Sequence, residues 1–467
     1  MAQESPFTDM PAEEFRKAGH EIVDWIADYL ADPRRHPIMT GIAPGDLIDK
    51  LPAHAPARGE PFDAIFRDFQ DLIVPSSTLW NHPRFFNFFS VSTSGPGILA
   101  EALIATLNMN GMIWKSSPAV TELEQVTLGW LRDWLGLPGS FFGIIHDTAS
   151  LATMHAILAA RTKADPAIRT EGSSPGMVLY TSEQAHSSVE KGALALGIGQ
   201  RYVRKIGLDS AYRMRPELLR QAIAEDRAAG LRPFCAVATV GTTATTAIDP
   251  VPAIAAICEE QDLWLHVDGA YGGHAGLVPE YRAYLDGCAR ADSFVVNPHK
   301  WLFTPIDLSA FYTRHPQYLR QALSLVPSYL QSAENPRALN YMDYSIALGR
   351  RFRALKLWFV MRYFGQERIV AIVRHHIEMA RELAQRIEAD PRFELAAPTP
   401  LSLVCFRLKA GDQATGELLA RIDRDRTAFL GQTVLDGRLT IRWAIGNIHT
   451  TQHDLDETWA LLQRSAG

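Results

Sequence analysis

Apolar residues recur along this chain with two different periods, one typical of helices and one typical of strands. Between residues 8 and 31 they recur every three or four positions, as on one face of an amphipathic helix. Thr8 or Asp9 is expected to cap this helix, and Pro11 would lie in its first turn. The Pro- and Gly-rich stretch from 33 to 62 predicts an extended connector. Because one helix with such an arm cannot bury its own apolar face, we expect it to pack on another subunit of a dimer.

Helical and strand patterns alternate from about residue 120 to residue 312. Short apolar runs rich in β-branched and aromatic residues are typical of buried strands in a parallel sheet. The runs predicted as strands are 177–180, 202–206, 234–240, 263–267, 293–296 and 308–312. Helical patterns separate several of them, for example at 216–229 and 251–261. The alternation predicts an α/β domain with a mostly parallel central sheet.

Residues after about 346 follow a different pattern, which predicts a smaller α+β domain. Helix-like stretches at 347–363, 367–388 and 452–464 flank strand-like runs at 401–408 and 439–444. A length of 467 residues also exceeds what one hydrophobic core usually supports. We therefore expect three parts: an N-terminal helical dimerisation segment (1–85), a large α/β domain (86–345) and a small C-terminal α+β domain (346–467).

Composition and charge exclude several classes of protein. The chain is 47% hydrophobic with a net charge of -6, and no basic cluster suggests a nucleic-acid or membrane surface. The four cysteines form no C-x-x-C pair, which argues against a zinc site or a disulfide framework and suits a reducing compartment. We find no signal-peptide pattern and no run of 18 apolar residues, so we expect a cytoplasmic protein without a membrane span.

An acid and a lysine each lie just past the end of a predicted buried strand. Asp268 follows the run 263–267, and Lys300 lies shortly after the run 293–296. In open α/β sheets, ligands bind at the carboxyl ends of the strands. Pyridoxal 5'-phosphate (PLP) needs such a pair, because the amine bonds to its aldehyde and the acid keeps its pyridine nitrogen protonated. Either residue alone could belong to a turn, a cap or a solvated loop, but the two together favour a PLP site.

Other polar residues near predicted strand ends have both functional and structural interpretations. Thr148, Ala149 and Ser150 directly precede a helical pattern and could bind a phosphate, or Thr148 could be a plain helix cap. His186 could stack on a pyridine ring or lie in a surface loop. Thr243 could bind cofactor or substrate, or belong to a turn without function.

The remaining histidines and motifs give no further site. His146 and His155 are nine residues apart and do not share a helix face, so we interpret both as structural. His375 and His376 lie in an otherwise polar helical stretch and are expected to be solvated. The H-E-x-x-H, G-x-G-x-x-G, P-loop and Gly-x-Ser-x-Gly motifs are absent, which argues against a serine hydrolase in particular.

Six segments in the same order are similar to the PLP-dependent group II decarboxylases, and specifically to the aromatic-L-amino-acid decarboxylases. They are Trp-Asn-His-Pro at 80–83, Ser-Ser-Pro-Ala-Val-Thr-Glu-Leu-Glu at 116–124, Gln-Ala-His-Ser-Ser at 184–188, His-Val-Asp-Gly-Ala-Tyr at 266–271, Asn-Pro-His-Lys-Trp at 297–301 and Leu-Gly-Arg-Arg-Phe-Arg at 348–353. The resemblance spans nearly the whole chain. It implies the aspartate aminotransferase-like fold (fold type I) and a homodimer with active sites at the subunit interface. The implied reaction converts aromatic L-amino acids, of the Phe, Trp, Tyr or DOPA type, to arylalkylamines and CO2.

The resemblance also implies roles for individual residues. Lys300 would carry PLP, Asp268 would bind its pyridine nitrogen, and His186 and Ala270 would pack on its two faces. Tyr329 matches the mobile-loop tyrosine that protonates the α-carbon. The implied phosphate-binding and neighbouring cofactor residues are Thr148, Ala149, Ser150, Thr243, Asn297 and His299. The expected substrate-binding residues are Trp80, Phe88, Phe89, Met112 and Arg442.

Two departures from the family pattern concern the substrate and the phosphate site. Animal relatives carry Tyr-Phe-Pro-Thr where this chain has Phe88-Phe89-Ser90-Val91, so two hydroxyl-bearing residues are replaced by apolar ones. This exchange weakens the expectation of a catechol preference. Leu151 stands where family members carry Glu, with no obvious mechanistic consequence.

Three other functions remain as alternatives. An aromatic aldehyde synthase of the same family replaces the loop tyrosine, so Tyr329 argues against it. A group II decarboxylase of another amino acid, such as glutamate or histidine, is the second, and the aromatic residues at 80, 88 and 89 argue against a strongly acidic substrate. A non-enzymatic PLP-fold scaffold is disfavoured because Lys300 and Asp268 are both present.

Overall fold

Two β-sheets, one in each of two lobes, organise the part of the chain that the computed structural model describes, namely residues 9–172, 174–325 and 338–467. The sheet of the larger lobe has seven strands in the order β2-β8-β7-β6-β5-β3-β4. Strands β4, β3, β5, β6 and β7 pair in parallel, whereas β8 runs antiparallel to both of its neighbours. The strands are β2 (Phe142–His146), β3 (Met177–Ser182), β4 (Val203–Ile206), β5 (Arg232–Thr239), β6 (Trp264–Asp268), β7 (Ser293–Val296) and β8 (Ser309–Thr313).

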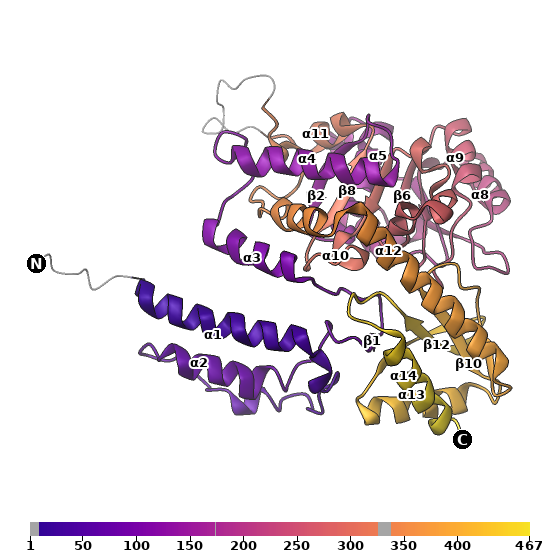
Figure 1. The fold of residues 1–467 in the computed structure, drawn as a ribbon. Helices are drawn as coiled ribbons and strands as arrows, with labels where there is room; N and C mark the ends of the chain where they lie inside the picture. The colour runs from indigo at the N-terminus through magenta and orange to yellow at the C-terminus, as the bar shows by residue number, and fades with distance from the viewer. Residues whose placement is uncertain (1–8, 173, 326–337) are drawn as a thin grey trace, which may run out of the picture.

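Helices cover both faces of this sheet, which explains why its strands are continuous apolar runs (Figure 1). Every residue of β3, β6 and β7 is buried. The helices around the sheet are α4 (Pro118–Leu135), α5 (Ala149–Ala164), α6 (Ile168–Glu171), α7 (Ser188–Ala195), α8 (Pro216–Ala228), α9 (Val251–Glu260), α10 (Pro298–Trp301) and α11 (Pro316–Leu323). The predicted α/β class with a mostly parallel sheet is confirmed.

The sheet of the smaller lobe joins strands from both ends of the chain. Its order is β1-β11-β12-β10-β9, and β1 pairs in parallel with β11. The boundary expected between residues 85 and 86 therefore falls inside β1. Helices α13 (Asp412–Asp425) and α14 (Gln452–Ser465) pack on this lobe. The strands are β1 (Phe85–Phe86), β9 (Phe393–Leu395), β10 (Leu403–Leu408), β11 (Phe429–Leu435) and β12 (Arg438–Ala444).

One long helix, α12 (Ala354–Ala389), runs from the larger lobe to the smaller one (Figure 1). The sequence predicted two helices here, at 347–363 and 367–388, and the first of them begins seven residues later than expected. The two are continuous except at Gly365, whose φ of 65° and ψ of 169° interrupt the helical geometry. Glycine adopts a positive φ without steric cost, so the kink lies where the sequence permits it.

The N-terminal helices α1 (Ala12–Ala31) and α2 (Phe62–Asp68) lie side by side as an arm that projects from the lobes (Figure 1). The Trp25 ring meets the Phe69 ring at a centroid distance of 5.1 Å. The predicted cap is wrong at Asp9, because Pro11 holds the N-cap position and no side chain caps α1. Thr8 lies outside the described residues. Helix α3 (Gly95–Leu107) connects this region to the larger lobe.

The connector between α1 and α2 is extended, as expected, apart from the short 3-10 turns Pro33–Arg35 and Ile48–Lys50. Arg34 attaches it to the smaller lobe, because its guanidinium donates to both oxygens of Asp454 at 2.8 and 2.6 Å. None of the helices in the described ranges is both long and apolar enough to cross a membrane.

Candidate active site

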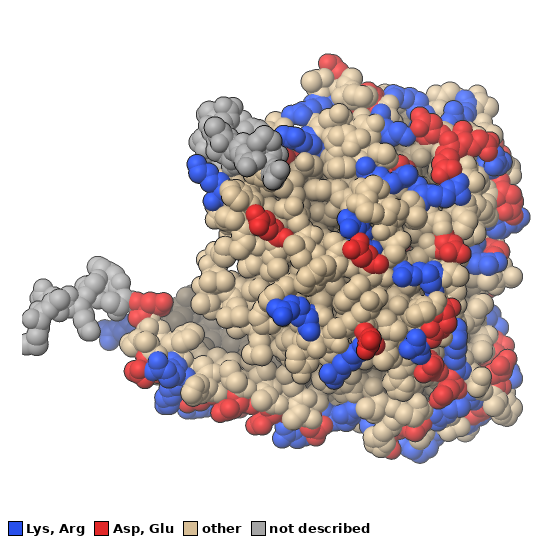
Figure 2. All heavy atoms as spheres, turned by 45° about the horizontal axis from the view of Figure 1, so that its top comes forward, with Lys and Arg blue, Asp and Glu red and all other residues tan. Residues whose placement is uncertain are grey.

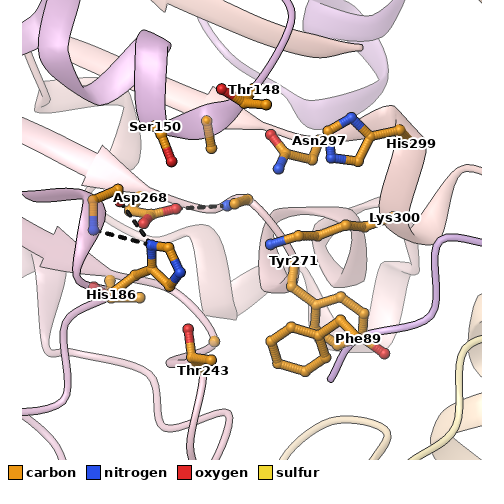
Figure 3. A pocket seen from close by; sticks show the side chains of 15 residues that line it. Phe89, Thr148, Ser150, His186, Thr243, Asp268, Tyr271, Asn297, His299 and Lys300 are labelled. Carbon is orange, nitrogen blue, oxygen red and sulfur yellow. Dashed lines mark hydrogen bonds between the residues drawn. The ribbon is translucent and has the colours of Figure 1, made fainter. Parts of the chain in front are cut away.

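A cavity of about 210 Å³ opens at the carboxyl ends of β3, β5, β6 and β7, beside the N-termini of α5 and α10 (Figure 3). An apolar cavity of about 150 Å³ can admit a benzene ring, so this one has room for a substituted six-membered ring. All ten residues that the sequence predicts as cofactor-binding line it: Thr148, Ala149, Ser150, His186, Thr243, Asp268, Ala270, Asn297, His299 and Lys300. The parallel strands bring these distant segments to one edge of the sheet.

Lys300 and Asp268 both point into the cavity (Figure 3). The Lys300 amino group lies 5.5 Å from the centroid of the Phe89 ring, and no described residue accepts a hydrogen bond from it. Burial lowers the pKa of Lys300, while the charge of Asp268 opposes that shift. One Asp268 oxygen accepts the Ala270 N–H at 3.0 Å, and the other has no hydrogen-bond partner among the described residues. The site thus offers a nucleophilic amine and a free carboxylate oxygen.

His186 presents an exposed imidazole to the same cavity. Its Nδ1 lies 2.8 Å from the Ser188 hydroxyl and accepts the Ser188 N–H at 3.2 Å. Partial burial is the main cause that lowers the pKa of His186. The charge of Asp268 opposes this shift, and Lys300 adds a smaller lowering effect. The ring is therefore held in place by one nitrogen, in the neutral form, with its flat face available for stacking.

The N-terminus of α5 forms another wall of the cavity. Thr148 caps the helix, because its hydroxyl accepts the Leu151 N–H at 3.4 Å, so the plain-cap interpretation is correct as far as it goes. The backbone N–H groups of Ala149 and Ser150 have no partner among the described residues. Free N–H groups at the N-terminus of a 16-residue helix favour an anion such as a phosphate.

Two side chains near α10 are held so that a donor group remains free. Asn297 accepts the Ser309 hydroxyl at 2.7 Å through its amide oxygen, which leaves its NH2 group available. His299 accepts the Leu308 N–H at 2.8 Å through Nδ1, and burial lowers its pKa to about 3. The imidazole is therefore neutral, and its proton is on Nε2.

The turn after β5 and an arginine from the smaller lobe form a further wall. Gly241 has a φ of 86°, and a Cβ there would lie 2.9 Å from the Gly272 backbone, so only glycine fits this close approach. Arg442 of β12 donates to the carbonyls of Thr243 and Ala244 at 2.6 and 3.1 Å. This predicted substrate-binding residue therefore lies beside the cavity and holds the turn that carries Thr243.

The other predicted substrate-binding residues divide into two groups. Phe89 lines the cavity and is 6% exposed. Trp80, Phe88 and Met112 are not among the residues that line it in a single chain, and Trp80 and Phe88 are instead largely exposed. Their predicted contact with substrate would need a second subunit. Tyr329 lies outside the described residues.

Sequence reasoning missed several residues that line the cavity, namely Ser188, Thr239, Gly241 and Tyr271. Tyr271 directly follows Ala270, so its place in the sequence is a signal that could have identified it. Thr239 is the register partner of Asp268 on the neighbouring strand β5. Such a neighbour follows only from the register of the sheet, which the sequence does not provide.

Together these groups fit PLP. Unpaired N–H groups at α5 suit its phosphate, the free Asp268 oxygen suits its pyridine nitrogen, and the Lys300 amine suits its aldehyde. His186 and Ala270 line the same cavity with a flat ring and a small side chain, against which the pyridine ring could pack.

Comparisons with known proteins agree with this chemistry. Residues 44–409 match the family model of the pyridoxal-dependent decarboxylase conserved domain. The chain is 37% identical to tryptophan decarboxylase 2 of Oryza sativa subsp. japonica, over 98% of this chain and 95% of that protein. It is 38% identical to a phenylacetaldehyde synthase of Arabidopsis thaliana, over 98% and 96%.

A solved structure is similar over the same extent. The crystal structure of Oryza sativa TDC with PLP and tryptamine superposes with a TM-score of 0.95 and 33% identity, and covers 98% of this chain and 99% of that one. The predicted fold class, that of the fold type I PLP enzymes, is confirmed. The match of the family model to most of the chain, together with relatives of this identity and coverage, shows that the chain belongs to the PLP-dependent decarboxylase family.

Proposed function

We propose that this protein decarboxylates aromatic L-amino acids to arylalkylamines and CO2. The observation that carries the proposal is the placement of Lys300, Asp268 and His186 around one cavity that Phe89 closes with an aromatic wall. Similarity to a tryptophan decarboxylase supports an aromatic substrate. The fit of the cavity to PLP supports decarboxylation, because bound PLP takes up the electron pair that a departing carboxylate leaves on the α-carbon.

Each cavity residue has a distinct role in this proposal. Lys300 would hold the cofactor before substrate arrives and would yield it to the substrate amine. Asp268 keeps the proton on the pyridine nitrogen through a charge-assisted hydrogen bond. His186 and Ala270 orient the ring from its two faces. The residues that hold the phosphate are Thr148, Ala149 and Ser150, with Asn297, His299 and Thr243 as further donors close to the cofactor.

The reaction balances with one proton. The bond between the α-carbon and the carboxylate breaks and CO2 leaves. The bonding electron pair stays with the substrate, where bound PLP would take it up until a proton reaches the α-carbon. Tyr329 would then deliver a proton to that carbon, and the Lys300 amine would displace the product amine. Of the predicted substrate residues, Phe89 packs against the aromatic ring, while Arg442 keeps the turn around Thr243 in place.

We further propose that the active enzyme is a homodimer in the cytoplasm. Leu99, Leu103 and Leu107 of α3 are exposed, as are Phe15 and Val23 on the arm. Figure 2 shows few charged residues on the part of this face next to the arm. A second subunit covering this surface would also bring Trp80, Phe88 and Met112 of one chain toward the active site of the other. The four cysteines are free and buried, which suits a reducing compartment.

Light scattering tests the dimer directly. Leu103→Glu places a charge in the middle of the exposed α3 surface and should shift the mass from two chains toward one, with loss of activity. Lys409→Glu changes the charge at an exposed site on the smaller lobe and serves as the control. A wild-type protein that has the mass of one chain and is fully active would contradict the dimer.

Aldehyde synthesis from the same amino acids is the second candidate, because a phenylacetaldehyde synthase is 38% identical to this chain. The two reactions differ in their products, since the synthase consumes oxygen and releases aldehyde, ammonia and peroxide. We favour decarboxylation because Tyr329 is present. Measuring CO2, amine, aldehyde and peroxide together from Phe, Tyr, Trp, DOPA, 5-hydroxytryptophan, His and Glu separates both candidates and identifies the substrate.

The central test concerns Lys300. Wild-type protein should be yellow with bound PLP, and borohydride should fix the cofactor covalently at Lys300. Lys300→Ala should still bind PLP weakly, lose the absorbance of the lysine-bound cofactor and lose nearly all turnover. Lys409→Ala, at a distant exposed lysine, should behave as wild type. A normal spectrum in Lys300→Ala would overturn the assignment.

A further inference from the structure

A column of stacked aromatic rings extends from the cavity into the interior of the protein. The Phe89 and Tyr271 rings stack at a centroid distance of 3.9 Å, with planes 10° apart. Tyr271 and Trp301 stack at 4.5 Å, with planes 5° apart. Behind them, the Trp301 Nε1–H donates to Nδ1 of His376 at 3.0 Å. Phe89 and Tyr271 line the cavity, whereas Trp301 and His376 lie behind it, fully buried.

Hydrogen bonds anchor the column in both lobes. The Tyr271 hydroxyl pairs with the hydroxyl of Ser402, next to β10, and lies 3.4 Å from the Ile445 carbonyl after β12. At the other end His376 belongs to α12, the helix that joins the lobes. Contacts outside the cavity therefore hold the stacked rings in position.

His376 can accept the Trp301 N–H only while its Nδ1 carries no proton. Burial lowers the pKa of His376 to about 3, against a smaller opposing effect from a backbone hydrogen bond with Asn447. The side chain is 1% exposed. The imidazole is therefore a neutral acceptor throughout the physiological pH range. No other described residue accepts a hydrogen bond from the Trp301 N–H.

Trp301 is the residue directly after Lys300, and both belong to the single turn of α10. The Trp301 ring, stacked on Tyr271 and hydrogen-bonded to His376, therefore restrains the backbone of this turn, which also carries Lys300. We propose that His376 is a positioning residue for Lys300: by accepting the Trp301 N–H, it holds the ring column and α10 in the orientation that directs the lysine amine into the cavity. This inference rests on the proposed role of Lys300 as the residue that carries PLP.

The test compares three substitutions in the full-length protein. His376→Leu removes the acceptor, and His376→Asn places an amide oxygen close to the position of Nδ1. Val373→Ala removes buried volume about one turn earlier on the same helix and is the control for general destabilisation. Thermal unfolding of each apo protein reports on the fold, while PLP affinity and the circular dichroism of the bound cofactor report on the lysine.

Leaving a buried N–H without an acceptor destabilises the conformation that buries it. We therefore expect effects on binding and turnover on the order of 10-fold. His376→Leu should raise the Kd for PLP and lower kcat, each by about 10-fold, with a much smaller change in KM and an altered cofactor dichroism. His376→Asn should recover most of both. Val373→Ala should lower the unfolding temperature and leave the Kd and the dichroism unchanged.

Trp301→Phe tests the same hydrogen bond from its other side, because it removes the donor while keeping an aromatic ring. In a Trp301→Phe background, His376→Leu should add little to the change in Kd, since the hydrogen bond is already absent. The proposal is overturned if His376→Leu resembles Val373→Ala, or if His376→Asn is as impaired as His376→Leu. Failure of the underlying assignment would appear instead as a normal cofactor spectrum in Lys300→Ala.

Discussion

At the scale of single residues, the cavity combines one carboxylate with nitrogen groups whose protonation is opposed by burial. The pKa values of Lys300, His186 and His299 are all lowered mainly by desolvation. The two imidazoles therefore remain neutral beside the cofactor. In the proposed complex, the positive charge near the pyridine nitrogen would come from a proton that Asp268 stabilises.

The role of Asp268 can be tested by removing its charge alone. Asp268→Asn keeps the shape of the side chain but no longer favours a proton on the pyridine nitrogen. We expect turnover to collapse, while circular dichroism of the backbone and the unfolding temperature stay close to wild type. Asp286→Asn, at a carboxylate outside the cavity, is the matched control. Near-normal turnover in Asp268→Asn would rule the role out.

Tyr329→Phe separates a catalytic tyrosine from a packing one. The substitution keeps the ring and removes only the hydroxyl that carries the proton, and a positioned acid typically contributes about 10²–10⁴-fold. Amine production should fall by roughly that factor. The unprotonated α-carbon would then be open to oxygen, so aldehyde, ammonia and peroxide should accumulate. Amine made at the parent rate without aldehyde would mean that another group supplies the proton.

The residues that carry the chemistry of the site could be predicted from the sequence, whereas the buried residues packed behind the cavity could not. Asp268 and Lys300 could be found because each lies just beyond a short apolar run that ends at the same edge of the sheet. His376 was expected to be solvated, and this was wrong. Its neighbour His375 is exposed, but one step further around α12 the ring faces Trp301. A helix period shows which residues share a face, not which partner covers that face.

At the scale of elements, the segment between β1 and α3 carries the departure from animal relatives. Phe88 adopts a φ of 50° and is exposed, whereas Phe89 turns inward to the cavity. Phe88 and Val91 offer no hydroxyl to a substrate ring. In the proposed dimer, where Phe88 would reach the partner's active site, the segment would present an apolar wall in place of the hydroxyl-bearing residues expected of animal relatives.

This segment predicts the substrate preference. A site that hydrogen-bonds a ring hydroxyl discriminates strongly, whereas an apolar wall discriminates weakly. We expect kcat/KM for Phe or Trp to be at least as high as for DOPA. Val91→Thr, which restores a hydroxyl of similar size, should raise the relative preference for DOPA. A wild-type kcat/KM for DOPA far above those for Phe and Trp would contradict this expectation.

Element boundaries were predictable where the apolar pattern was uninterrupted. Strand β7 begins and ends where the sequence indicated, and α9 ends one residue earlier. Strand β2 was missed, because Gly143 and the short run Phe142–His146 give a weak strand signal before a long helix. His146 and His155 nevertheless stack at 4.2 Å, because α5 folds back beside β2. Only the fold brings these two residues together.

At the scale of the whole molecule, buried neutral histidines should make the protein sensitive to acid. Burial lowers their pKa values to about 4 or about 3, below the value near 6.5 of an unfolded chain. These histidines are His82, His155, His266 and His274 (about 4), and His299 and His376 (about 3). Between pH 6.5 and 4 the unfolded state therefore binds more protons than the native state, so stability is lost as the pH falls.

Each such histidine lowers the free energy of unfolding by up to about 1.4 kcal/mol per pH unit in this window. Asp249 acts in the opposite direction, because burial raises its pKa to about 6, but it is one group against several. The urea midpoint should therefore fall steeply from pH 7 to pH 5. His20→Gln, at an exposed histidine, should leave this slope unchanged. Equal midpoints at pH 7 and pH 5 would contradict the expectation.

The pairing of β1 with β11 has a consequence for biosynthesis. Phe85 and Phe429 are register partners, so the N-terminal strand must wait for most of the chain to be translated before it can pair. Arg34 and Arg84 likewise await Asp454, close to the C-terminus. Until β11 has been translated and has left the ribosome, the side chains of Phe85 and Phe86, which are buried in the folded protein, have no partner strand. Until then the nascent chain exposes this pair of aromatic side chains, and chaperones can bind there.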